Sequence, residues 1–124
     1  MLCVDAIHFA SAVGAAAAEC LRILGPAGRL VLTTWEAASP DAGGIPERIR
    51  RMNIQRDLTD AGFVAVDVLH RPAWTAAEVS FWTTAAALDP DGDPAMAALR
   101  DEAVELLPLA SALKRLLVVA RTPG

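Results

Sequence analysis

The sequence predicts an α/β fold, in which helices flank a β-sheet. A helix-like stretch lies between two strand-like segments, and the short joint Gly25–Gly28 leads into the second of them. Strands connected through a helix in this way are parallel, with a right-handed crossover. The second segment, Arg29–Trp35, is almost continuously apolar, which favours a strand buried on both faces. A length of 124 residues suits one domain, residues 1–124.

The first elements are a short strand and a helix with a clear stop. Leu2–Ile7 is compatible with a strand, and Ser11 is a candidate N-cap for the following helix. Gly25 and Pro26 end that helix, because glycine suits the left-handed position after a helix and proline cannot continue it. Apolar residues at helical spacing form its buried face: Val13, Ala16, Ala17, Cys20, Leu21 and Leu24.

The middle of the chain predicts a loop, a helix and a strand. Glu36–Gly44 is rich in Ala, Ser, Pro, Asp and Gly, as loops are. Pro46 suits the first position of a helix that Gly62 ends. The alternation of valines from Val64 to Val68 then predicts a strand. The apolar face of the helix would carry Ile54, Leu58 and Ala61.

Two further helices and a last strand are expected in the C-terminal part. Thr75 and Glu78 have the spacing of a capping box, in which each side chain bonds to the other residue's amide at a helix start. Asp93 is a candidate cap for the next helix, with proline at its first position, and Pro108 would end that helix. Leu113–Arg121 is the last strand.

Composition excludes several classes of function. The net charge is −4 and basic residues are not clustered, so attraction to nucleic-acid backbones is not expected. No apolar run has the roughly 18 residues of a membrane span, and no basic segment opens a secretory signal, so a cytoplasmic location is expected. Cys3 and Cys20 are expected to be buried free thiols.

No metal site is expected. Asp89, Asp91 and Asp93 have the spacing of calcium ligands, but the sixth position of that loop is Pro94 and its twelfth is Arg100, where a calcium loop needs glycine and glutamate. The group Arg48, Arg50, Arg51 and Arg56 is interpreted as a solvated helix face.

Four motifs occur in order along the chain: Cys3–Phe9, Glu19–Val31, Leu58–Phe63 and Leu117–Pro123. Together they resemble class I S-adenosylmethionine (SAM)-dependent methyltransferases from their fourth strand onward. The most specific is Glu19–Val31, which is similar to the family's joint into its fifth strand. Ala27 departs from that pattern, since the family usually has glycine there.

The resemblance implies a partial Rossmann-like methyltransferase fold. Its mixed sheet would have about four strands in the family order 4-5-7-6, with the last strand antiparallel, flanking helices and a helical lid over residues 75–107. No G-x-G motif is present, so the chain is expected to be truncated before the glycine-rich SAM loop and to bind SAM weakly or not at all by itself.

The resemblance also assigns site residues. Ligands of open α/β sheets bind beyond the carboxyl ends of the strands. Asp5, Ala6 and Phe9 would then border the cofactor SAM, and His8 would be the candidate catalytic base, because its pKa lies near neutrality. The alternatives are a hydrogen-bonded structural histidine at position 8 and a plain helix-entry or turn carboxylate at Asp5.

Substrate-binding residues are expected at the ends of the later strands. Trp35, Arg71 and Trp74 are the candidates, and Trp82 could join the two tryptophans in lining an apolar acceptor pocket. Core or lid packing of the tryptophans is the alternative.

Three functions stay open at this level. The leading one is methyl transfer to a small-molecule acceptor, by resemblance. The second is a non-catalytic association module, either a homodimer or a complex with a separate N-terminal half, formed through the exposed edge of the family's fourth strand. The third is a small-ligand binder. No nucleic-acid or membrane partner is expected.

Overall fold

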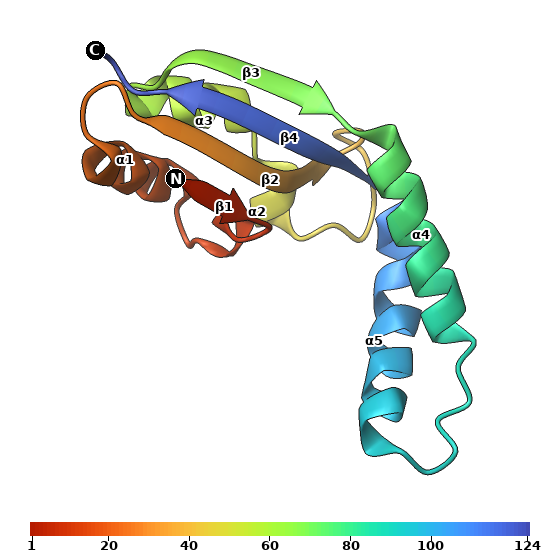
Figure 1. Ribbon diagram of the computed structural model, residues 1–124. Helices are drawn as coiled ribbons and strands as arrows, with labels where there is room; N and C mark the ends of the chain where they lie inside the picture. The colour runs from red at the N-terminus through yellow and green to blue at the C-terminus, as the bar shows by residue number, and fades with distance from the viewer.

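The computed structural model describes residues 1–124. The four strands are β1 (Leu2–Val4), β2 (Arg29–Ala37), β3 (Val64–His70) and β4 (Leu113–Arg121). They form one mixed sheet in the order β1-β2-β4-β3. β1 runs parallel to β2, and β4 runs antiparallel to both of its neighbours, so β1, β2 and β3 all point the same way (Figure 1).

The hydrophobic core lies on one face of the sheet. It joins α1 (Val13–Leu24) and α3 (Ile54–Ala61) to β2 and β4. Burial along β2 alternates, with Leu30, Leu32 and Thr34 fully buried and the residues between them only partly buried. The expectation that β2 is buried on both faces is therefore wrong. The residues on its second face are only partly buried, whereas those on its first face are fully buried.

Two N-terminal expectations are corrected. The first strand ends at Val4 rather than Ile7, because Asp5 has a φ of +48° and turns the chain into the 3-10 helix η1 (Ile7–Phe9). Ser11 does not cap α1; the N-cap is Ala12, without a side-chain bond. At the other end of α1, Gly25 has a φ of +65° and the helix stops as expected.

Ala27 occupies the left-handed region, with a φ of +54°. A β-carbon is strained there, by about 1 kcal/mol. The turn holds this conformation by a bond from the Ala27 amide to the Pro123 carbonyl, and the Thr122 hydroxyl donates to the Gly25 carbonyl. The tail thus closes over the joint into β2.

The single helix expected from Pro46 to Gly62 is two helices. α2 covers only Glu47–Arg50, and α3 starts anew after Asn53. The Asn53 side chain accepts from the Arg56 amide, a strong N-cap that begins a helix at this point. Gly62, with a φ of +108°, ends α3 as expected.

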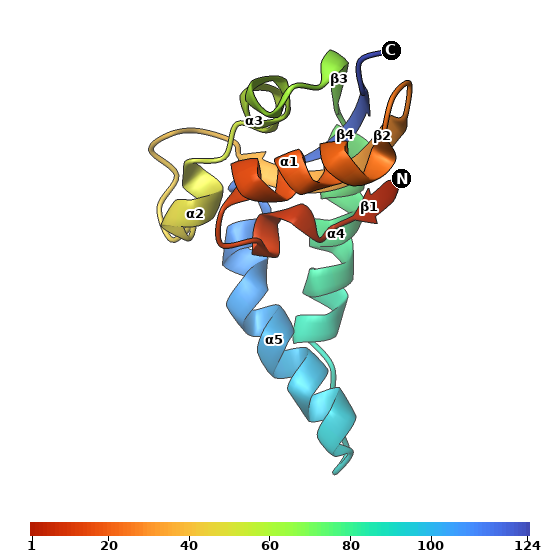
Figure 2. The same ribbon diagram turned by 90° about the vertical axis from the view of Figure 1, so that its left-hand side faces the viewer.

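A helical hairpin extends from the end of the sheet. α4 (Pro72–Ala86) follows β3 directly and α5 (Pro94–Ala110) leads into β4, and both views show the pair pointing away from the sheet (Figures 1 and 2). The Asp93 side chain caps α5 as expected, accepting from the amides of Ala95 and Met96. Pro108 does not end α5, which continues to Ala110.

The capping box at Thr75 is also wrong, because α4 already begins at Pro72. Both of its side chains have other partners. The Thr75 hydroxyl accepts from the Arg115 amide, and the Glu78 carboxylate accepts from the Trp35 indole. None of the helices combines the length and apolarity needed to cross a membrane.

Candidate functional site

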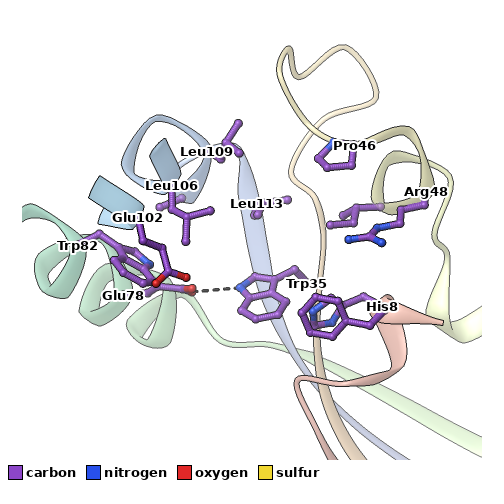
Figure 3. Close-up of a pocket in the computed structure, with 13 residues that line it drawn as sticks. His8, Trp35, Pro46, Arg48, Glu78, Trp82, Glu102, Leu106, Leu109 and Leu113 are labelled. Atoms are coloured by element: carbon purple, nitrogen blue, oxygen red, sulfur yellow. Dashed lines mark hydrogen bonds between the residues drawn. The ribbon is translucent and has the colours of Figure 1, made fainter. Parts of the chain in front are cut away.

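The parallel strands β1, β2 and β3 end at one edge of the sheet, and a pocket of about 410 Å³ lies there. This volume is within the range of small-molecule sites. Its walls come from η1, the end of β2, α2 and the inner side of the α4–α5 hairpin (Figure 3). The lining residues are His8, Phe9, Trp35, Pro46, Arg48, Ile49, Glu78, Trp82, Glu102, Leu106, Leu109, Ala110 and Leu113.

His8 lies at one side of this pocket and is almost completely buried, with 3% of its surface exposed. Its Nδ1 is 3.4 Å from the Thr34 hydroxyl, and its ring packs edge-on against Trp35 with the centroids 4.4 Å apart. Burial lowers the pKa of His8 below 6.5; the Asp5 carboxylate opposes this shift, and the Arg48 and Arg115 guanidiniums add to it. The imidazole is therefore neutral at neutral pH and retains the capacity to accept a proton.

The lowered pKa of His8 predicts a loss of stability in mild acid. The unfolded chain takes up a proton as the pH falls through 6.5, while folded His8 resists protonation until a lower pH. The stabilisation is therefore complete above pH 6.5 and is lost as the pH falls through the folded pKa. Urea unfolding between pH 7 and pH 5 measures it. His8→Gln should flatten the profile and His70→Gln should not; an unchanged profile for His8→Gln contradicts the prediction.

Asp5 is part of a charged network. Its carboxylate accepts from the Thr33 hydroxyl at 2.7 Å and from the Arg115 guanidinium at 2.9 and 3.0 Å. Arg115 also lies 3.8 Å from Glu78 and stacks over the Trp35 ring at 4.2 Å from its centroid. Glu78 in turn accepts from the Trp35 indole at 3.1 Å (Figure 3). This network ties α4 to β1, β2 and β4.

The residues predicted to bind substrate do not all line the same pocket. Trp35 lines the 410 Å³ pocket, whereas Trp74 lines a smaller pocket of about 310 Å³ that Trp35 and Glu78 also border. Arg71 lines neither of these pockets; its guanidinium lies 5.4 Å from the centre of the Trp74 ring. Trp82, which sequence reasoning named only as a possible pocket residue, does line the larger one.

Several pocket residues were missed. Arg48 is exposed, as its interpretation as part of a solvated helix face implies, but it also lies in the pocket wall. Glu102, Leu106 and Leu109 of α5 lie there as well. The apolar face of α5 that carries Leu106 can be recognised in the sequence, but the sequence does not indicate that this face lines a cavity. No group of His, Cys, Asp and Glu side chains is arranged to hold a metal ion.

The residues predicted to border the cofactor follow β1. Phe9 is exposed and Ala6 offers no polar side chain, while the carboxylate of Asp5 is held by Thr33 and Arg115. The glycines serve elsewhere. Gly25 and Gly62 follow helices, and a β-carbon at Gly43 would meet nothing, so no glycine cradle that a side chain would fill lies at the end of β1.

Comparison with known proteins identifies solved structures that share this fold. No protein-family model matches the chain, and no curated protein matches its sequence. Among solved structures, the [4+2]-cyclase SpnF superposes on 98% of the chain with a TM-score of 0.69 at 19% identity. Phosphoethanolamine N-methyltransferase 2 of Haemonchus contortus, in complex with SAM, superposes on 99% of the chain with a TM-score of 0.67 at 16% sequence identity. The chain has a class I methyltransferase fold.

A further methyltransferase-fold neighbour is a putative sarcosine dimethylglycine methyltransferase from Galdieria sulphuraria, with a TM-score of 0.67 over 98% of the chain at 15% identity. The chain spans about half the length of this protein and of SpnF, and a third of the Haemonchus enzyme. At such identities the likeness concerns the methyltransferase fold and carries no residue roles.

Proposed function

We propose that this chain forms the acceptor side of a SAM-dependent methyltransferase acting on a small molecule. The 410 Å³ pocket carries the proposal, because it adjoins the end of β1, where the resemblance expects the cofactor's methionine part. The fold neighbours include enzymes named as methyltransferases, which supports the same class. The cofactor-binding role of Asp5, Ala6 and Phe9 belongs to this proposal.

The pocket's own contribution would be positioning. SAM supplies an activated methyl group, and transfer by in-line displacement depends on alignment of the acceptor. Apolar side chains of α5 and Trp82 exclude water from one wall, and Trp35 is held in one orientation by Glu78 and Arg115. Neutral His8 would accept a proton from an acceptor that must lose one.

Calorimetry with the pure chain tests the cofactor part of this proposal. We expect no saturable binding at micromolar SAM, because the chain has no glycine cradle for the cofactor. A transfer assay with methyl-labelled SAM and a small-molecule extract then tests the activity. Saturable micromolar binding would contradict the first expectation. Acceptor binding without transfer, with SAM shown to be bound, would overturn the methyltransferase proposal in favour of a small-ligand binder.

The alternative function is association through β1. This strand is at the edge of the sheet, and Leu2 and Val4 are 69% and 57% exposed. Unpaired, apolar strand edges recruit further strands. Size-exclusion chromatography with light scattering should then show a dimer whose formation Val4→Lys weakens and Val64→Lys, on the opposite edge strand, does not. A chain that stays monomeric at high concentration contradicts the homodimer. If it also stays monomeric after a separate N-terminal half is added, the whole alternative is contradicted.

A further inference from the structure

Two charged side chains of the 410 Å³ pocket have no ionic partner. Arg48 on α2 and Glu102 on α5 both line it, and neither takes part in any salt bridge or side-chain hydrogen bond of the structure. They belong to opposite walls, with Trp35 between them in the close-up view (Figure 3). Both side chains are exposed, and the Arg48 guanidinium lies 5.8 Å from the centre of the Phe9 ring. The pocket therefore presents a positive charge at one side and a negative charge at the other, neither of them in an ion pair.

The other ionisable groups around the pocket leave this polarity intact. Glu78 lies beside Glu102 and adds to the negative side, although the Trp35 indole and Arg115 already bond to it. His8 lies beside Arg48 and contributes no charge at neutral pH, because burial lowers its pKa. Arg115 contacts the smaller pocket rather than this one.

The space between the two charges is apolar. Leu106, Leu109 and Leu113 form the back of the pocket, and Trp82 forms the wall next to Glu102 (Figure 3). An aromatic ring beside a carboxylate favours a cationic nitrogen, through attraction to both groups. A guanidinium favours carboxylate or phosphate oxygens, which it can contact with two N–H groups.

We propose that the ligand of this pocket is a small zwitterion with an apolar middle, whose anionic group binds Arg48 and whose cationic nitrogen lies between Glu102 and Trp82. If the proposed methyltransferase function holds, this zwitterion is the class of molecule that accepts the methyl group. Only its role as methyl acceptor rests on that proposed function. Binding itself requires no cofactor.

Titration of the full chain followed by NMR of its tryptophan indoles tests the proposal. The probes are 4-(aminomethyl)benzoate, benzylamine and benzoate. Trp35 and Trp82 should respond, while Trp74, outside the pocket, serves as an internal reference. The zwitterion should bind about tenfold more tightly than either singly charged probe, the gain expected of one added charge-assisted contact.

Substitutions assign each end. Arg48→Gln should reduce the affinity for the zwitterion to that for benzylamine, and Glu102→Gln should reduce it to that for benzoate. Arg51→Gln, at the residue that follows α2, and Glu105→Gln, on α5, lie outside the pocket and should leave both affinities unchanged. Equal affinities for the three probes, no response at Trp35 and Trp82, or insensitivity to Arg48→Gln and Glu102→Gln overturns the proposal. Because SAM is absent, failed methyl transfer leaves this result unaffected.

Discussion

Leu58→Ala is expected to lower the free energy of unfolding by about 3 kcal/mol. Leu58 is completely buried on α3, in the cluster that joins α1 and α3 to the sheet. Because this cluster covers only one face of the sheet, no second core compensates for a cavity in it. A loss of this size is a large part of the roughly 5–15 kcal/mol that stabilises a domain.

Urea unfolding followed by far-ultraviolet circular dichroism measures this loss. The control is Ile23→Ala on α1. Because the Ile23 side chain is 59% exposed, this substitution should change the free energy of unfolding by no more than about 0.5 kcal/mol. Equal midpoints for Leu58→Ala and Ile23→Ala would show that the core does not lie where α3 meets the sheet.

Arg115→Met should cost about 2 kcal/mol, below the usual range for a broken buried ion pair because Asp5 is a third exposed. The substitution keeps an unbranched side chain over Trp35 but leaves Asp5 and Glu78 without their cation. Since this network ties α4 to the sheet, the Trp35 and Trp82 indole resonances should shift or broaden as well.

The control for Arg115→Met is the preceding residue. Lys114 is 36% exposed at its side chain and lies 3.7 Å from Glu36, so Lys114→Met should change stability by less than about 0.5 kcal/mol. Equal effects of Arg115→Met and Lys114→Met would mean that the network does not contribute to stability.

Local chemistry predicted part of this fold from the sequence. Gly25 and Gly62 end helices, and Asp93 starts one, because glycine geometry and a capping carboxylate act within a few residues. Thr75 and Glu78 show the limit of such reasoning. Their spacing is right for a cap, but Arg115 and Trp35, distant in sequence, take both side chains.

The candidate site was less predictable for the same reason. His8 follows β1 and Trp35 lies near the end of β2, so their place at the sheet edge could be expected. Arg48 lines the pocket from α2, a four-residue helix that the periodicity of the sequence did not separate from α3. Glu102 lines the pocket from the inner side of the α4–α5 hairpin, and its side chain carries no local indication of that position.

The hairpin has one more consequence, for how this fold can diversify. α4 continues from β3 and α5 continues into β4, so both helices are anchored at the sheet, while their far ends meet only in the turn near Gly92. Insertions at exposed turns are tolerated where few contacts are disturbed. The segment between Leu88 and Asp93 can therefore lengthen or shorten over generations without altering strand pairing. The length of this turn and the sheet architecture can evolve as separate traits.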